Sequence, residues 1–172
     1  MKTHFNTNNN PRVIIIQKLY GKFFNKEEEL TFPKHRFKKF IKDVVKGTIE
    51  RNEVIDNEIS SGLLKNAKKS LPKKSKIKVI NVPGVFEIPV TISKYLKKFD
   101  AFIALGCVIK GQTPHFEFIC SASTNAIMEL SVESKKPIGN GIITCLTMSQ
   151  AKARKIKGTE AAKAVISVLS QK

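Results

Sequence analysis

The stretch from Lys110 to His115 carries the residue types that phosphate binding and proton transfer need. It follows the nearly continuous apolar run Ala101–Ile109 and contains a glycine, a hydroxyl, a lysine and an imidazole. Gly111 lets the backbone approach a ligand closely. Free N–H groups at a helix start, the Thr113 hydroxyl and Lys110 would suit a phosphate. The spacing therefore predicts a phosphate-binding turn at the end of a strand.

His115 is expected in the first turn of a helix that runs from about Pro114 to Leu130. The helix dipole disfavours a protonated imidazole there, so a neutral ring could exchange protons near pH 7. A structural histidine is the alternative. The sequence has neither G-x-x-x-x-G-K-[ST] nor G-x-G-x-x-G, which excludes a Walker loop and a dinucleotide fingerprint. No Ser/His/Asp triad can be assigned.

A second turn whose residues could bind a ligand or take part in a reaction lies between Val82 and Pro89. Its Pro83-Gly84 pair forces a sharp turn. Phe86 would then stand at the mouth of the sheet, with Glu87 at the start of a helix. The alternative makes Phe86 a core residue and Glu87 a partner of the helix dipole.

The elements that must position these turns alternate along the chain from about residue 60. Strands alternating with helices imply βαβ units and a parallel sheet, in which ligands bind at the carboxyl ends of strands. The predicted strands are Ile77–Val82, Ala101–Ile109 and Pro137–Thr144, and the predicted helices are Leu63–Leu71, one from near Glu87, Pro114–Leu130 and Ser149–Leu169.

The first 59 residues differ from the rest in their pattern of apolar residues, because they lack the alternation of strands and helices. Apolar residues at three- and four-residue steps predict one helix from near His35 to Ile59. The sequence pattern changes near Ser60-Ser61-Gly62. We therefore predict a helical N-terminal segment over 1–59, a fusion or an insertion, and an α/β domain over 60–172.

Composition excludes several classes of protein. Apolar residues make up 41% of the 172 residues, and no apolar run reaches the ~20 residues of a membrane span. The Asn-rich start lacks the apolar core of a signal peptide. Cys107, Cys120 and Cys145 form no C-x-x-C pair, which is typical of reduced thiols in a cytoplasmic protein. We expect no metal, because the histidines lie far apart and the cysteines have no metal-ligand spacing.

The formal charge of +17 is concentrated in the second part of the chain. Residues 1–60 hold 12 basic and 8 acidic side chains, whereas residues 61–172 hold 19 and 6, so the net charges are +4 and +13. Such a field attracts polyanions and small phosphorylated substrates alike. Most basic residues are lysines, which lack the planar fork with which arginine reads phosphates and bases.

From about Gly62 onward the chain resembles lumazine synthase, the penultimate enzyme of riboflavin biosynthesis. Val82–Pro89 is similar to the family's V-P-G-A-F-E-I-P, and Ala104–Phe116 to its A-L-G-x-V-I-[RK]-G-x-T-x-H-[FY]. Pro137–Thr144 looks like its fourth strand, and Gln150-Ala151 with Arg154 like its Q-A-x-x-R helix. The resemblance implies a three-layer α/β/α fold, flavodoxin-like, with a mostly parallel four-stranded sheet.

The resemblance also implies a reaction. A ribitylaminouracil amine condenses with 3,4-dihydroxy-2-butanone 4-phosphate, a Schiff base forms, phosphate is eliminated, and the ring closes to 6,7-dimethyl-8-ribityllumazine. No cofactor or metal is required. The family's sites lie between subunits of a pentamer, so a homopentamer is expected, whereas a membrane partner is not.

Roles for individual residues follow from the resemblance. Phosphate would be held by Gln112 and Thr113, with Arg154 reaching in from a neighbouring subunit, and His115 would shuttle protons. Lys157 corresponds to a family lysine, and Asn140 stands where many members carry Phe. The pyrimidine and ribityl chain would contact Val85, Phe86 and Glu87, and the ring pocket would be lined by Cys107, Val108 and Ile109.

The N-terminal part departs from that family. The expected first strand and an R-F-N-like turn do not directly precede the helix at Leu63. Residues 12–17 could supply the strand, or could form an amphipathic helix. Arg12–Tyr20 and Phe37–Ile59 instead resemble the opening helices of the transcription antitermination factor Nus B, an RNA-binding protein. An RNA-binding, non-catalytic module is therefore the alternative function.

Overall fold

The computed structural model describes residues 15, 18, 29–32, 34, 36–44 and 55–171. Contacts divide the chain into two compact units, Met1–Val54 and Ile55–Lys172. The expected boundary at 59/60 stays a prediction.

In the N-terminal unit, the described residues 38–44 are helical, and so are Ile15 and Lys18. Ile41 is fully buried and packs against Ile15, Leu30 and Phe32. The helical state of Ile15 contradicts a strand at that residue and agrees with the helix alternative for residues 12–17. The rest of that stretch, and residues 45–54 of the predicted long helix, lie outside the described residues.

The C-terminal unit begins with a helix in two parts. The π-helix η2 (Ile55–Ser60) leads directly into α3 (Ser61–Ser70). Ile59, Leu63 and Ala67 recur every four residues and are buried on one face. Leu71 is extended because the residue before a proline disfavours the helical conformation, so α3 ends there, close to the predicted end.

Two parallel strands form the sheet of this unit. β1 (Phe102–Ile109) pairs with β2 (Ile138–Cys145), in a register that runs from Phe102↔Ile138 to Ile109↔Cys145. The crossover helix α5 (His115–Ser134) connects them, and ends where Lys135 adopts a left-handed conformation. Both strands and this helix agree with their predicted ranges to within a few residues.

The predicted four-stranded sheet is wrong for the part of the chain that the structure describes, because only two strands pair there. Residues 75–82 include the predicted strand Ile77–Val82 but join no ladder. The side chains of Ile77, Val79 and Ile80 are 48%, 43% and 37% exposed. A strand needs a partner for its backbone, and neither β1 nor β2 pairs with this segment.

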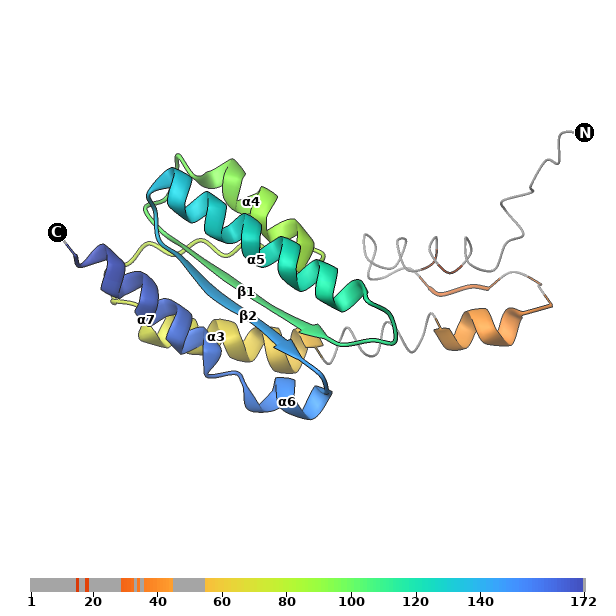
Figure 1. The fold of residues 1–172 in the computed structure, drawn as a ribbon. Coiled ribbons are helices and arrows are strands. Elements are labelled where there is room, and N and C mark those ends of the chain that lie inside the picture. The colour runs from red at the N-terminus through yellow and green to blue at the C-terminus, as the bar shows by residue number, and fades with distance from the viewer. Residues whose placement is uncertain are drawn as a thin grey trace, which may run out of the picture. The chain divides into compact units, whose positions relative to one another are not determined.

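Helices cover the sheet on both faces, as expected for three layers (Figure 1). One face carries α5 and the short pair η3 (Val85–Glu87) and α4 (Ile88–Tyr95), and the other carries α3, α6 (Met148–Ala153) and α7 (Lys157–Leu169). The first face is built on Val85, Ile88, Ile92, Ala104, Ile127 and Ile142, and the second on Ile59, Leu63, Ile143, Cys145 and Ala151.

Close backbone approach fixes α7 against its neighbours. Gly158 is buried, and a Cβ there would collide with the Leu63 carbonyl of α3. Asn66 Nδ2 donates to the Lys155 carbonyl at 2.9 Å, and Thr159 Oγ1 donates to the Asn66 carbonyl at 3.2 Å. These bonds hold the turn between α6 and α7 against α3. None of the described helices is long and apolar enough to cross a membrane.

Candidate active site

Of the two turns that the sequence singles out, the one at 110–114 directly follows a strand of the sheet, whereas the one at 83–87 follows residues 75–82, which pair with neither strand. β1 and β2 are parallel, so the turn at 110–114 and the start of α6 lie at the same end of the sheet (Figure 1). Contacts join η3 to both β1 and α5. We call this end of the sheet the rim. η3 packs on Gly106, three residues before the end of β1, and His115 is exposed at the rim rather than aimed into the interior.

The turn at Gly84 leads into η3, which packs against β1 through the Val85 side chain. Val85 is buried, and a Cβ on Gly106 of β1 would lie only 2.7 Å from Val85 Cγ2. Gly106 is therefore the residue type that lets η3 approach the strand. Because its side chain points into the core, Val85 offers a ligand its backbone alone.

Phe86 and Glu87 follow on the same short helix. Phe86 is 58% exposed, which contradicts the alternative that places it in the core. Glu87 is half-buried at the N-cap of α4, where its side chain makes no capping hydrogen bond. Its Oε2 would lie 3.0 Å from a Cβ at Gly84, so the carboxylate folds back over the turn. An aromatic ring and a carboxylate thus stand side by side in sequence at the rim.

The turn after β1 is open. The Lys110 N–H donates to the Cys145 carbonyl at 2.8 Å and continues the ladder by one residue. Beyond it Gln112 and Thr113 are exposed, and a Cβ at Gly111 would meet no atom within 4 Å. No side chain caps the start of α5. Its first N–H groups can therefore serve an anion, with the favourable end of the helix dipole behind them.

Glu117 is a rim residue that the sequence analysis missed. Its Oε1 lies 2.6 Å from Lys110 Nζ, and both side chains are about half exposed. The hydrogen bond from Lys110 and a backbone hydrogen bond lower the pKa of Glu117. A phosphate would have to compete with Glu117 for Lys110. Burial, aided by the Glu117 charge, raises the pKa of the nearby Cys120 thiol.

The last residues of β1 do not form one wall. Val108 packs toward the α4–α5 face, whereas Cys107 and Ile109 pack toward η2 and α6. This is the alternation that a strand imposes. All three are half-buried, so their edges and backbone reach the rim.

η2 covers the strand ends on that second face. Ile55 and Ile59 pack into the cluster that contains Cys107 and Ile109. Glu58 Oε2 lies 2.7 Å from Lys152 Nζ of α6. The hydrogen bond and charge of Lys152 lower the pKa of Glu58. This ion pair joins η2 to α6 beside the rim.

Arg154 ends α6 and is exposed. The helix is capped by Thr147, whose hydroxyl accepts from the Gln150 N–H at 3.3 Å. Arg154 Nη1 donates to the Gln150 carbonyl at 3.2 Å, so its side chain folds back along α6. Lys157 Nζ binds Glu160 Oε2 at 2.8 Å.

Asn140 lies away from the other predicted site residues. It is the third residue of β2, five residues before the strand ends, which corresponds to about 16 Å along the strand. Its Oδ1 accepts a hydrogen bond from the Ile142 N–H at 3.0 Å. Within one chain it therefore cannot share the rim with His115.

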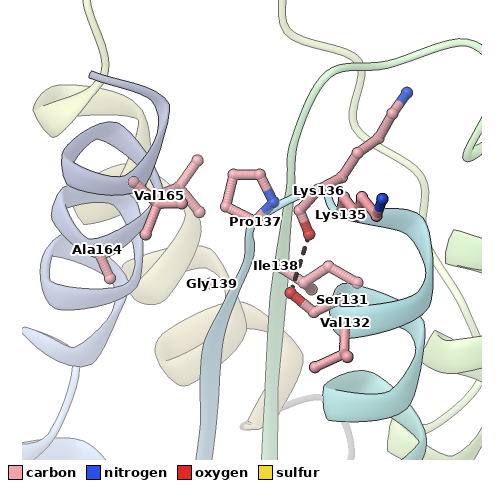
Figure 2. A pocket seen from close by; sticks show the side chains of 10 residues that line it. Ser131, Val132, Lys135, Lys136, Pro137, Ile138, Gly139, Ala164 and Val165 are labelled. Atoms are coloured by element: carbon pink, nitrogen blue, oxygen red, sulfur yellow. Dashed lines mark hydrogen bonds between the residues drawn. The ribbon is translucent and has the colours of Figure 1, made fainter. Parts of the chain in front are cut away.

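A pocket of about 350 Å³ opens at the other end of the sheet. It lies between the end of α5, the start of β2 and α7 (Figure 2). Ser131 Oγ donates to the Lys136 carbonyl at 2.9 Å beside it, and Lys136 Nζ donates to the Leu96 and Phe99 carbonyls, each at 2.7 Å. The pocket contains none of the predicted site residues. Over the described ranges, no three His, Cys, Asp or Glu side chains cluster as metal ligands would.

Comparison with known proteins adds a family to this geometry. The sequence model of the family described as 6,7-dimethyl-8-ribityllumazine synthase matches residues 44–172. Similar proteins carrying that name come from Cutibacterium acnes (46% identity over 99 residues, 54% of this chain and 60% of the relative) and Corynebacterium kroppenstedtii (43% over 99 residues, 54% and 62%). One from Kocuria rhizophila is 39% identical over 118 residues, 63% of this chain and 76% of the relative. The chain thus spans about 60% of the length of the first two.

Proposed function

Because the chain belongs to the 6,7-dimethyl-8-ribityllumazine synthase family, we propose that it makes 6,7-dimethyl-8-ribityllumazine in riboflavin biosynthesis. The substrates would be 5-amino-6-ribitylaminouracil and 3,4-dihydroxy-2-butanone 4-phosphate. The observation that supports the proposal is that η3, which carries Phe86 and Glu87, contacts both β1 and α5, the helix that begins at His115.

The phosphate would bind at the start of α5. The exposed Gln112 and Thr113 side chains and the first N–H groups of the helix are donors there, and Gly111 leaves open space beside them. Lys110 would add its charge by turning from Glu117 to the phosphate. The dianionic product of elimination would bind in the same place, which favours departure of phosphate from the substrate.

His115 would move the protons. Imine formation releases water from the carbonyl, and elimination requires a carbon-bound proton to leave as phosphate departs. An exposed imidazole one residue from the phosphate turn can accept that proton and return it when the ring closes with loss of a second water. The remaining catalysis would come from holding the two substrates together.

The uracil would lie against Phe86, with Glu87 binding the ribityl hydroxyls. The Phe86 ring is exposed to solvent at the rim, and the carboxylate of Glu87 makes no capping hydrogen bond to α4. Cys107, Val108 and Ile109 would line the ring through their backbone and exposed edges.

Asn140, Arg154 and Lys157 would serve the site of a neighbouring subunit. Asn140 lies about 16 Å from the end of its own strand, and Arg154 folds along α6. A homopentamer with sites between subunits would bring them to another copy's rim. We also propose a cytoplasmic location, in keeping with three free cysteines among the described residues. The comparisons give no support to an RNA partner, and the resemblance of the N-terminal segment to Nus B stays a prediction.

The test is formation of lumazine absorbance from the two substrates by the full chain. We expect activity in the unaltered chain and in Thr124→Ala, an exposed change on α5. His115→Ala should lose about 100-fold or more, the usual contribution of general acid–base catalysis. No lumazine from a folded chain, or equal rates in the two variants, would contradict the proposal.

A further inference from the structure

The turn between β1 and α5 carries several backbone N–H groups that can serve a ligand. In the part of the chain that the structure describes, no acceptor bonds to the N–H groups of Gly111–Thr113, His115 or Phe116. The first N–H groups of any helix lack an intrahelical partner, and no side chain caps the start of α5. These donors suit the several oxygens of a phosphate.

Two neighbouring residues of α5 hold Lys110 beside this turn. Its Nζ lies 2.6 Å from Glu117 Oε1 and 5.9 Å from the centroid of the Phe116 ring. The hydrogen bond from Lys110 lowers the pKa of Glu117, and so does a hydrogen bond from the backbone of Glu117 itself. Glu117 is therefore charged near neutral pH, and it binds the lysine that the proposed phosphate would also attract.

This ion pair is weak enough for a phosphate to break. Both side chains are about half exposed, and exposed pairs contribute little because water and salt screen them. A phosphate dianion carries more charge than a carboxylate, and its other oxygens can accept from the N–H groups of the turn. Phosphate would therefore bind Lys110, but breaking the pair with Glu117 would subtract from the free energy of binding.

We propose that Glu117 is a positioning residue that competes with phosphate for Lys110 and so sets how tightly the turn binds phosphate. The inference rests on the phosphate site of the proposed function. When phosphate binds, Lys110 leaves Glu117 and contacts the phosphate; when phosphate leaves, the ion pair forms again. Glu117 thus favours release of the phosphate that the reaction eliminates, and it weakens binding of the phosphorylated substrate through the same contact.

The test measures binding of inorganic phosphate to the full chain by isothermal titration calorimetry, at one pH and low ionic strength. Glu117→Gln should bind phosphate about two- to fivefold more tightly, the range expected from an exposed ion pair. Lys110→Met should bind it about tenfold or more weakly, because a charge-assisted hydrogen bond is lost. Glu133→Gln removes the same charge at an exposed position near the end of α5 and should leave the affinity unchanged.

The double variant shows whether Glu117 acts through Lys110. Once residue 110 is methionine, Glu117 has no lysine to hold. Adding Glu117→Gln to Lys110→Met should therefore change the phosphate affinity by less than about 1.5-fold. An equal gain with and without Lys110 would mean that Glu117 only repels the phosphate, which would overturn the proposal.

Inhibition by phosphate distinguishes this role from a merely structural one. Added phosphate should inhibit lumazine formation by Glu117→Gln more strongly than by the unaltered chain, by the same factor as in the binding measurement. A residue that only supports the fold would not strengthen the inhibition. Glu133→Gln is again the matched control, and its inhibition by phosphate should equal that of the unaltered chain.

Two further results would overturn the proposal. One is phosphate binding by Glu117→Gln that is unchanged or weaker, and the other is no phosphate binding by the unaltered chain. The calorimetric test needs neither substrate, so it separates the two proposals. Absence of lumazine contradicts the proposed function alone, whereas lumazine formation with unchanged phosphate affinity in Glu117→Gln contradicts the role of Glu117 alone.

Discussion

At the scale of single residues, the rim carries a lysine that is paired with a carboxylate and that the proposed phosphate would also attract. Lys110 Nζ binds Glu117 Oε1 at 2.6 Å and lies 5.9 Å from the centroid of the Phe116 ring. The sequence predicts Lys110 as a phosphate ligand but does not predict its ion pair, because the pair depends on where the first turn of α5 starts relative to the end of β1. A carboxylate in the first turn of a helix that follows a lysine-ended strand is the signal that could have found it.

We expect the Glu117 titration to report this ion pair. Since Lys110 lowers the pKa of Glu117, Lys110→Met should raise that pKa toward its ordinary value of 4.5. In the unaltered chain, the pair stabilises the fold above the ordinary carboxyl pKa, and this contribution disappears as pH falls through the lowered value. The measurement is an NMR pH titration of the Glu117 side chain in both proteins. An unchanged midpoint would show that the pair does not persist in solution.

At the scale of elements, the sequence predicts those helices and strands whose positions depend on apolar spacing and on proline and glycine nearby in the chain. α3, α5 and both strands follow from apolar spacing, Pro72 and the Lys110-Gly111 stop. Ile77–Val82 has the apolar residues typical of a strand, interrupted by Lys78 and Asn81, but it forms no strand, because pairing depends on a distant partner that the pattern does not contain. The rim was predictable for the same reason as the strands, since parallel strands place their carboxyl ends together. The sequence did not predict that Asn140 lies far from the rim, nor that η2 covers the strand ends.

The exposure of 75–82 predicts how little that segment contributes to stability. Val79→Ser should change the free energy of unfolding by less than about 0.5 kcal/mol, because the exposed side chain gives up few packing contacts. Ile59→Ala, at a fully buried position, should cost about 2–5 kcal/mol. Urea unfolding of both variants followed by circular dichroism measures the contrast. A large loss in Val79→Ser would mean that the segment is paired in solution.

Gly158 and Gly111 make a second matched pair. Gly158→Ala places a methyl group against the Leu63 carbonyl and should destabilise the chain by about 1–3 kcal/mol or more. Gly111→Ala meets no atom within 4 Å, so its effect on stability should be small. The two urea midpoints give the comparison. Equal midpoints would contradict the close contact of α3 with α7.

At the scale of the whole molecule, α5 leaves an apolar face uncovered. Phe118, Met128 and Val132 are 70%, 63% and 68% exposed on this helix. Exposed apolar side chains on one element are typical of surfaces that bind another protein. In the proposed homopentamer, neighbouring subunits would cover them.

We therefore expect light scattering of the unaltered chain to give about five times the monomer mass. Phe118→Glu with Met128→Glu should shift that mass toward the monomer, because two charges cannot be buried in an apolar contact. Thr124→Glu, at an exposed polar position of the same helix, is the control for added charge. An unaltered chain that stays monomeric at working concentration would contradict the pentamer.

The bonds of Asn66 have a consequence for the order in which the second unit folds. They join residues 89 and 93 positions apart, from Asn66 to Lys155 and to Thr159. The paired strands and α5, in contrast, form one continuous stretch from Phe102 to Cys145. Closing the longer loop costs more chain entropy and yields its contacts later. The βαβ stretch should therefore assemble first, with α3 docking on α7 as the last step and their separation as the first step of unfolding.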